Sequence, residues 1–488
     1  MKKYEILCVL IVVIAISMRF VNYEHRWGLA YDQAHDALVA RYAVQAGKIP
    51  LVGPFSSAGP FQTGGEWYWF LMIPTAIYPG YILSPWIFMT MLYCVFVVVI
   101  MRGAYLLEGR FFAVIVGLLA TVSTAQIAQG VNLTNQSPQA FFALLSIYAM
   151  VKLIQTKKNI FLFFMGFCIG LAGSIHLQGV ALLAMAFFTI VFTKSIKIKV
   201  LLWLFLGLFL PVIPILIYDM GHDMFNIKNM FQYYLHDQYK ISLDVLGRRW
   251  LTYGGKFIPT SWSYVIGGYP ILGYVQVVGL FLFFGYGLLK KFISKPFLII
   301  FLSTAVMFTI LRYTRTPLFD SYLVFLHPFI LLLSGYFVYR LTKIHKILGF
   351  TLLLILIMGS ILRDIPEMKG GYNYSYDTSY RFVQTLKQKF PNKHFVIYDK
   401  NINIKDKSFP LVLYLDSLGM LDKKGYKIGL TLELVEHKIL YPRVLGEPGG
   451  YVLFDINGIE THELKADNWS IVTPEEVYRS TEEWYTKR

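Results

Sequence analysis

The sequence predicts a polytopic α-helical membrane protein with about eleven transmembrane helices and a small extracytoplasmic α/β or α+β domain over residues 363–488. The composition, the length of the apolar runs and the placement of Lys and Arg lead to this fold class. The chain is 56% hydrophobic and 15% charged, whereas a soluble domain is about 45–50% apolar and about 25% charged. Lipid is therefore expected to surround most of the chain.

The apolar runs have the length of membrane-spanning helices, since about 20 residues rising about 1.5 Å each cross about 30 Å of hydrocarbon. The first run lacks the small-residue cleavage site of a signal peptide, so we expect it to be retained. The expected spans form one transmembrane module over 1–362 and lie near 4–21, 83–101, 111–130, 138–154, 160–175, 178–193, 200–217, 265–289, 296–311, 319–339 and 346–362.

Lys and Arg residues predict the orientation, because cytoplasmic loops are rich in them. Alternate connections hold sixteen of these bases and two acids, Glu5 and Glu108. We expect the cytoplasmic (inner) membrane, a cytoplasmic N-terminus, and loops 22–82 and 218–264 outside together with the C-terminal domain. The sixteen bases are Lys2, Lys3, Arg102, Arg110, Lys152, Lys157, Lys158, Lys194, Lys197, Lys199, Lys290, Lys291, Lys295, Arg340, Lys343 and Lys346.

The net charge of +16 does not indicate a nucleic-acid partner. The cytoplasmic loops account for most of it, and residues 363–488 hold eighteen bases and eighteen acids. A basic nucleic-acid-binding surface is therefore not expected. All three cysteines lie in expected spans, so no disulfide framework is predicted. No P-loop or Rossmann fingerprint indicates a nucleotide cofactor.

The outer loops are predicted to contain juxtamembrane helices. Residues 33–46 form one, with Asp32 as its N-cap and Gly47 just past its end. Segment 67–82 is apolar, but two prolines interrupt it and two tryptophans head it, so we expect an interfacial helix rather than a span. A further interfacial helix is expected in MFNIKNMFQYYLHDQY of the second loop.

The C-terminal domain alternates helical and strand-like patterns. Helices are expected at 376–390, at 409–420 in part, and from Pro474 onward; strands are expected at 394–399, 426–433 and 451–456.

The motif YDQAHD at 31–36 holds the candidate catalytic residues. A partly desolvated carboxylate at the outer membrane surface can act as a general base toward an acceptor hydroxyl. Asp32 and Asp36 lie one helical turn apart, with His35 beside them. The alternative is structural: Asp32 caps the helix, and Asp36 is a solvated acid that the helix dipole favours.

Five cations lie on the outer face, where positive charge is least expected. Arg248, Arg249 and Lys256 lie in the second loop, and Arg312 and Arg315 lie in the turn between two spans.

The order of these features resembles the GT-C superfamily of glycosyltransferases, and within it the protein O-mannosyltransferase and lipid A aminoarabinose transferase group. The shared features are a first span, an acidic motif on a short outer helix, a Pro- and Gly-rich turn, an aromatic WYW segment and many further spans. The resemblance covers 1–362 and is specific around 30–70. It implies an inverting enzyme that moves a sugar from a polyprenyl-phosphate donor to a glycan, lipid or protein acceptor on the outer face.

The resemblance assigns roles to individual residues. Asp32 matches the first acid of the family's Asp-Glu motif, the base, whereas Gln33 stands where the family usually has Glu. PFQTGGEWYW at 60–69 lies where the family has a Pro-Pro motif, but the prolines are missing and Glu66 is added. These departures leave the subfamily and the acceptor open.

The remaining candidates follow from this assignment. His35, Asp36 and Glu66 are expected to support catalysis or contact the acceptor. The five outer cations are expected to bind the departing lipid phosphate, with head groups or Asp320 as their alternative partners. Asp32, His35, Asp36 and Glu66 can also be grouped as divalent-metal ligands, although their spacing fits no metal motif.

Three other functions stay open. A lipid or glycan transporter (flippase) predicts internal repeats and ionisable residues at mid-membrane, whereas polar residues here gather at the outer ends of spans. The second alternative is another enzyme of the same superfamily, either a lipid-linked glycan ligase or an oligosaccharyltransferase. The lack of a WWDYG-like motif argues against the oligosaccharyltransferase. A non-catalytic envelope assembly protein is the third.

Overall fold

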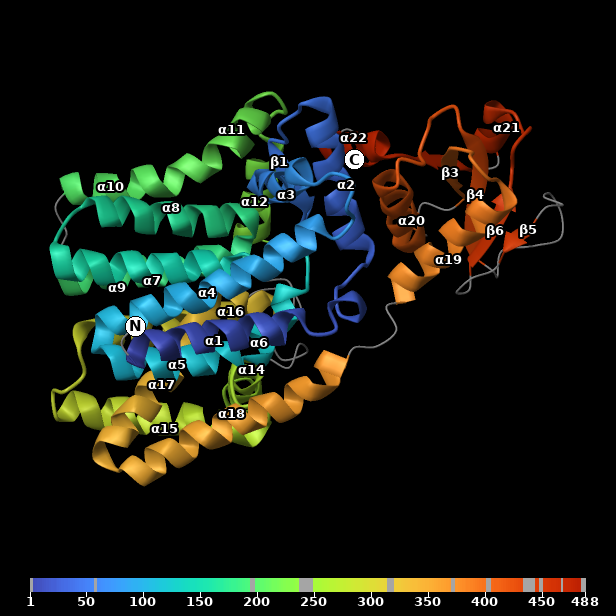
Figure 1. The fold of residues 1–488 in the computed structure, drawn as a ribbon. Coiled ribbons are helices and arrows are strands. Elements are labelled where there is room, and N and C mark those ends of the chain that lie inside the picture. The colour runs from blue at the N-terminus through green and yellow to red at the C-terminus, as the bar shows by residue number, and fades with distance from the viewer. Residues whose placement is uncertain are drawn as a thin grey trace. The chain divides into compact units, whose positions relative to one another are not determined.

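The computed structural model describes residues 3–56, 59–193, 198–236, 249–313, 320–369, 374–400, 405–432, 444–446, 451–466 and 468–483. The chain forms two compact units (Figure 1). Unit 1 contains residues 1–23, 51–66 and 89–370, and unit 2 contains residues 24–50, 67–88 and 371–488. Unit 2 thus combines the C-terminal segment with two pieces of loop 22–82 and the first residues of the expected span 83–101. The domain boundary expected after residue 362 stays a prediction.

Each expected span falls on an apolar helix or on a short run of helices. These are α1 (Lys3–Phe20), α4 (Ser84–Glu108), α5 (Arg110–Thr121) with α6 (Thr124–Gly130), α7 (Gln139–Thr156), α8 (Ile160–Ile175), a 3₁₀ turn Leu177–Leu182 with α9 (Leu183–Thr193), α10 (Ile198–Phe209) continued by a 3₁₀ turn Leu210–Val212 and α11 (Ile213–Met220), α15 (Pro270–Leu289), α16 (Lys295–Arg312), a 3₁₀ turn Asp320–Leu326 with α17 (His327–Ile344), and α18 (Lys346–Lys369).

Seven helices in the described part of the chain are long and apolar enough to cross a membrane. The number is eight if α5 and α6, which meet at 57°, form one span. The expected segment 160–175 is a shorter apolar helix, and so is the helical run 177–193. The predicted fold class, a polytopic helical membrane protein with a small strand-containing C-terminal region, is confirmed.

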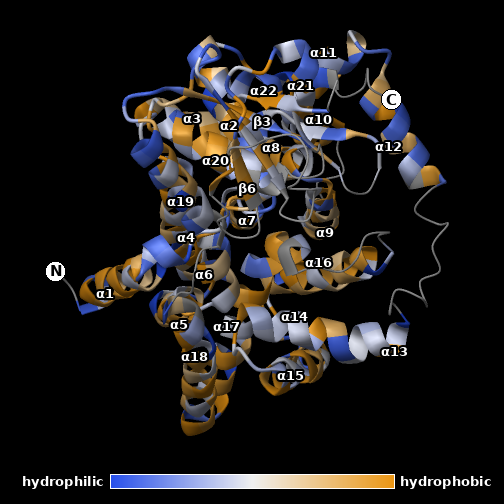
Figure 2. Ribbon diagram, turned by 90° about the vertical axis from the view of Figure 1, so that its right-hand side faces the viewer, coloured by the Kyte–Doolittle hydropathy of each residue, from blue (hydrophilic) through white to orange (hydrophobic). Residues whose placement is uncertain are grey.

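Helix α17 forms the centre of unit 1. It is almost wholly buried and packs against α5, α7, α15, α16 and α18. The run formed by α10 and α11 instead exposes large apolar side chains, including Phe205 and Leu206. Figure 2 shows hydrophobic residues along most of α18 as well. Exposed apolar faces of this extent fit helices whose outer surface meets lipid.

Glycines bring the backbones of α8 and α10 into contact. A Cβ atom on Gly207 of α10 would lie 2.2 Å from the carbonyl oxygen of Phe163. On α8, a Cβ atom on Gly166 or Gly170 would lie 2.4 or 2.5 Å from a carbonyl oxygen of α10. Small residues four positions apart allow such close helix packing in membranes.

We expect Gly207→Leu to destabilise unit 1, because the new side chain meets backbone that cannot move aside. Overpacking typically costs about 1–3 kcal/mol. Thermal unfolding of the purified protein measures the effect as a lower midpoint. Gly285→Leu on α15 is the matched control, since nothing lies within 4 Å of a Cβ atom there. Equal midpoints for the two variants would contradict the packing argument.

Loop 22–82, which is expected on the outer face, contains helices and strands in its described residues. Helix α2 spans Tyr31–Ala46, and its N-cap is Ala30, so the prediction of Asp32 as N-cap is wrong. Gly47 ends the helix in the left-handed conformation (φ 63°), as predicted. The following stretch forms an antiparallel hairpin of β1 (Val52–Phe55) and β2 (Gln62–Gly64).

Helix α3 (Glu66–Ile77) has 12 residues. Its length is about 18 Å, less than the thickness of about 30 Å that a span must cross. This agrees with a helix that does not span, and its place at the membrane interface stays a prediction.

Loop 218–264, the second one expected on the outer face, contains α12 (Phe225–Leu235), α13 (Trp250–Thr252), a π-helical turn Tyr253–Phe257 and α14 (Ile258–Val265). The buried Asp219 carboxylate accepts hydrogen bonds from Asn226 N (3.1 Å) and Ile227 N (2.8 Å) at the start of α12. Asn226 Oδ1 in turn accepts one from Gln62 N (2.7 Å). The two outer-loop segments of unit 1 are therefore joined.

Unit 2 contains a five-stranded mixed sheet in the order β5-β6-β4-β3-β7. β3 and β4 pair in parallel, with α20 between them in sequence, and the other neighbours pair antiparallel. The strands are β3 (Phe395–Asp399), β4 (Tyr426–Leu432), β5 (Val444–Gly446), β6 (Tyr451–Asp455) and β7 (Ser470–Val472), and the helices are α19 (Tyr374–Lys389), α20 (Lys405–Ser417), α21 (Thr461–Ala466) and α22 (Pro474–Glu482). The core on one face is formed by Val396, Tyr398, Val452, Phe454, Ile456, Leu464 and Trp469.

Candidate functional site

The first turn of α2 exposes Asp32. The Gln33 side chain accepts a hydrogen bond from Ala30 N (2.9 Å), which closes the start of the helix. Gln33 thus has a structural role at the position where the family motif has Glu. Asp32 lies in the first turn with its side chain exposed, where the helix dipole favours a carboxylate.

Asp36, one turn further along α2, is buried, with 4% of its surface exposed. Its carboxylate accepts hydrogen bonds from Trp67 Nε1 (2.7 Å) and Tyr68 Oη (3.4 Å) on α3. Burial, and then the charge of Asp36, raise the pKa of the Tyr68 phenol well above its usual range. The phenol therefore keeps the proton that it donates. Buried carboxylates require such donors, so the alternative of a solvated Asp36 is wrong.

His35 lies beside Asp36, as the motif predicts. Its Nδ1 is 3.0 Å from Asp36 Oδ1, and its Nε2 is 3.2 Å from Thr481 Oγ1 on α22. The ring also packs near Phe409 of α20, with centroids 5.7 Å apart. Two C-terminal helices of unit 2 therefore contact the acidic motif.

Arg41 joins α2 to the same C-terminal helices. Its Nε lies 2.5 Å from Asp416 Oδ2 on α20, and the two side chains are only 7% and 14% exposed. Arg41 also donates to the carbonyl oxygen of Pro79. Helix α2 packs on both α20 and α22. This buried ion pair fixes the helix that carries the acidic motif within unit 2.

Glu66 belongs to unit 1, at the start of α3. It is 6% exposed, and its Oε2 accepts a hydrogen bond from Ser174 Oγ (2.8 Å). Its Oε1 is buried and has no hydrogen-bond partner among the described residues. Burial raises the pKa of the Glu66 carboxyl. Gly64 leaves room for the contact, because a Cβ atom there would lie 2.0 Å from Ser174 Oγ.

We expect Glu66→Gln to remove a pH-dependent part of the stability. Because the folded-state pKa exceeds the unfolded-state value, folding favours the protonated acid. The resulting stability is fully present below the unfolded-state pKa and is lost as the pH rises through the folded-state pKa. Thermal unfolding between about pH 4 and 8 should show the wild type losing stability relative to Glu66→Gln. Glu24→Gln, at an exposed acid, should keep the wild-type dependence, and an unchanged profile for Glu66→Gln would contradict the assignment.

Three of the five cations expected on the outer face lie in the described part of the chain, and Arg248 and Arg315 lie outside it. The Arg312 guanidinium, at the end of α16, lies 4.2 Å from the ring centroid of Trp250 and 5.0 Å from that of Tyr313. Arg249 directly precedes Trp250. We call Arg249, Trp250, Arg312 and Tyr313 the cation–aromatic cluster.

Lys256 is exposed on the π-helical turn that follows this cluster. Tyr253, in the same turn, donates a hydrogen bond to the carbonyl oxygen of Phe308 on α16 (2.6 Å). This contact fixes the turn to the helix that carries Arg312.

The described residues contain no group of three or more His, Cys, Asp or Glu side chains that could hold a metal ion. The predicted ligand set is divided between the units, with Asp32, His35 and Asp36 in unit 2 and Glu66 in unit 1.

Several residues of the site were not predicted from the sequence. Trp67 and Tyr68 were assigned to the membrane interface and to the aromatic segment of the resemblance, but not to Asp36, to which both donate. Asp416 and Thr481 were not singled out at all. Arg41 offered a usable signal, because it is the one base within α2 and stands among Ala, Leu and Val residues. Such a charge predicts a buried partner.

No protein-family model matches the chain, and no curated protein matches it. Solved structures do match. The lipid A aminoarabinose transferase ArnT from Cupriavidus metallidurans in the apo state gives a TM-score of 0.61 at 12% identity, over 91% of this chain and 97% of that chain. ArnT bound to undecaprenyl phosphate gives a TM-score of 0.59 at 12% identity, again over 91% of this chain and 97% of that chain. The oligosaccharyltransferase from Archaeoglobus fulgidus in the apo form gives 0.48 at 14% identity, over 85% of this chain and 60% of that chain. The likeness to ArnT concerns the fold: this chain has an ArnT-like fold, as the resemblance over residues 1–362 implies.

Proposed function

We propose that this chain is an inverting glycosyltransferase that moves a sugar from a polyprenyl-phosphate carrier to an acceptor hydroxyl. The observation that carries the proposal is the ArnT-like fold over 91% of the chain. ArnT has been solved with undecaprenyl phosphate, and we assign to this chain a donor in which a sugar is linked to the same class of lipid phosphate. The exposed Asp32 carboxylate supports the proposal, because it lies in the motif that resembles the catalytic motif of the family.

The proposed reaction is a single displacement. Asp32 takes the proton of the acceptor hydroxyl, whose oxygen attacks the anomeric carbon of the sugar. The bond from that carbon to the phosphate oxygen breaks, and the lipid phosphate leaves with the electron pair. One displacement inverts the configuration. Asp36 is held by Trp67 and Tyr68, so we assign it a positioning role for α2.

The cation–aromatic cluster is the proposed site for the departing phosphate. Guanidinium groups bind phosphate oxygens through paired hydrogen bonds and stabilise the charge that develops on them. The rings of Trp250 and Tyr313 hold the Arg312 guanidinium in place. We propose that this chemistry takes place on the outer face of the cytoplasmic membrane, and the Lys- and Arg-rich connections support that orientation.

Arg312→Gln should raise the KM for the polyprenyl-phosphate sugar donor by about 10- to 150-fold, because a hydrogen bond to a charged group contributes about 1.5–3 kcal/mol. Donor titrations in membranes measure it. Arg340→Gln is the matched control, since the Arg340 guanidinium also lies over an aromatic ring, 4.7 Å from the Phe292 centroid, but on the side predicted to be cytoplasmic. An equal rise in KM for both variants would contradict the role of the cluster.

The experiment that tests the function follows labelled undecaprenyl-phosphate sugars in membranes that contain the wild-type chain. Release of undecaprenyl phosphate together with labelling of an acceptor supports the proposal. Movement of the intact labelled lipid across the bilayer, without consumption, would replace it with the flippase alternative. Transfer from a lipid-linked oligosaccharide alone would replace it with the glycan ligase alternative.

A further inference from the structure

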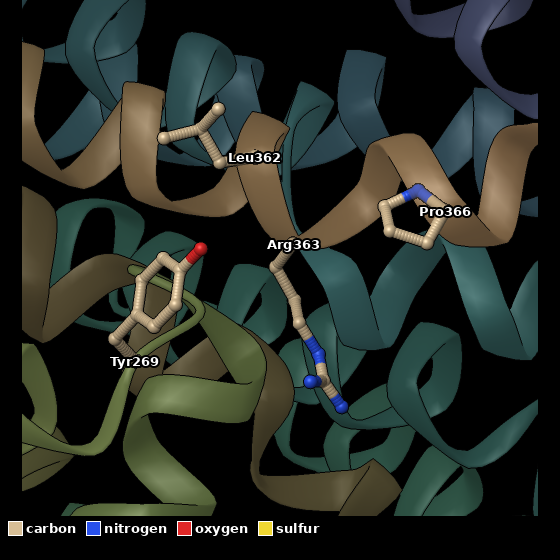
Figure 3. A pocket seen from close by; sticks show the side chains of 4 residues that line it. All are labelled: Tyr269, Leu362, Arg363 and Pro366. Carbon is tan, nitrogen blue, oxygen red and sulfur yellow. The ribbon is translucent and has the colours of Figure 1, made fainter.

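A pocket of unit 1 has no part in the proposed reaction. It has a volume of about 410 Å³ and is lined by Tyr269, Leu362, Arg363 and Pro366. Tyr269 precedes α15, and the other three residues lie at the end of α18 (Figure 3). The volume is within the range of about 300–1,000 Å³ found for small-molecule sites.

Glycine contacts hold the two walls of the pocket together. The turn before α15 contains Gly267 (φ 106°) and Gly268 (φ 73°), in a conformation that other residues rarely adopt. A Cβ atom on Gly268 would lie 2.5 Å from the carbonyl oxygen of Gly359 on α18. Gly267 N also donates to Ser360 Oγ (2.8 Å). Tyr269 and Arg363 are therefore held beside the same cavity without a ligand.

Arg363 is the charged residue among the four that line the pocket. Its side chain is exposed, and no hydrogen bond or ion pair joins its guanidinium to another residue in the described part of the chain. Five donors are therefore available to a ligand, in a planar arrangement that suits phosphate oxygens. The exposed Tyr269 can add a hydroxyl donor.

The apolar surface of α18 that leads to the pocket indicates which kind of phosphate-containing ligand would bind there. Leu354, Met358, Leu362 and Ile365 are all exposed, and they follow one another along α18 at intervals of three or four residues. They form a stripe that runs along the helix to the pocket. A stripe on a membrane-spanning helix meets lipid chains, so Arg363 lies where a chain would meet its phosphate.

We propose that the Arg363 pocket binds the phosphate of a membrane lipid, whose chains lie along the α18 stripe. Arg363 binds the phosphate oxygens, and Tyr269 donates one further hydrogen bond. An arginine that only extends toward the membrane surface needs no facing wall, whereas Arg363 lines an open pocket whose opposite wall, at Tyr269, is fixed by glycines. The site shares no residue with α2 or with the cation–aromatic cluster, so it stands whether or not the chain transfers a sugar.

Native mass spectrometry of the full chain in neutral detergent, titrated with phosphatidylglycerol, tests the site. We expect Arg363→Gln to weaken binding about five- to tenfold, as for the loss of about 1 kcal/mol or more of interaction with a lipid phosphate. Lys369→Gln removes the same charge from an exposed position on the same helix and should leave binding within about twofold of wild type. Arg363→Lys should bind between the wild type and Arg363→Gln.

Two outcomes would overturn the proposal. The first is equal binding of phosphatidylglycerol by the wild type and by Arg363→Gln, with both showing the same thermal midpoint. The second is binding of inorganic phosphate as tight as that of phosphatidylglycerol, because the site would then take a soluble anion. Weak or absent binding of inorganic phosphate by the wild type supports the lipid.

Discussion

Replacement of Asp32 by Asn is expected to lower kcat by about 10²–10⁴, the contribution of a general base. The amide cannot take the acceptor proton, whereas the helix start stays closed by the bond from Ala30 N to Gln33. The Asp32 side chain is exposed, so the thermal midpoint should change little. Transfer from a labelled polyprenyl-phosphate sugar measures kcat, and thermal unfolding of the same sample measures stability.

Two variants make this result specific to Asp32. Glu24→Gln removes an exposed acid of the same unit and should keep wild-type kcat. Asp36→Asn should lower stability and activity together, because Trp67 and Tyr68 lose the carboxylate that accepts their hydrogen bonds. Full activity of Asp32→Asn would exclude Asp32 as the base. Loss of activity in Asp36→Asn at wild-type stability would move the base to Asp36.

The spans could be predicted because their signal is local. A helix that crosses hydrocarbon must satisfy its own backbone hydrogen bonds and carry about 20 apolar residues. Both conditions depend on consecutive residues, so a single stretch of sequence is enough to recognise such a helix. The strands of unit 2 are less visible. β5 and β7 have three residues each, which is too short for an alternating pattern, and only their pairing with neighbouring strands defines them.

The candidate site could be predicted only in part, because its partners are distant in sequence. The motif at 31–36 identified Asp36 and His35, but the donors to Asp36 come from α3, and the partner of His35 comes from α22. Asp32 was expected to cap the helix because Asp is a favoured N-cap residue. In the structure, the Gln33 side chain accepts the hydrogen bond from Ala30 N instead, and α2 begins at Tyr31. Local sequence propensity was enough to predict helix α2. Contacts with residues distant in sequence determine that Asp36, rather than Asp32, is buried.

Breaking the ion pair between Arg41 and Asp416 is expected to destabilise unit 2 by about 3–5 kcal/mol, the cost of leaving one buried charge without its partner. Arg41→Met leaves the Asp416 carboxylate without its cation, and Asp416→Leu leaves the Arg41 guanidinium. Both side chains are largely buried, so water cannot replace the missing partner. Chemical denaturation of the purified protein, followed by limited proteolysis of the C-terminal segment, measures the loss.

The double variant Arg41→Met/Asp416→Leu decides whether the two charges act as a pair. Apolar residues in place of a buried ion pair are often neutral or stabilising, so the double variant should recover most of the stability that each single variant loses. The Pro79 carbonyl loses its donor in both variants that lack Arg41, which limits the recovery. Losses that simply add would mean that the pair does not couple α2 to α20. Because α2 carries Asp32, both single variants should also lower kcat, although we assign neither residue a contact with the sugar. The double variant should recover kcat in step with stability, which separates positioning of the helix from a direct role in the chemistry.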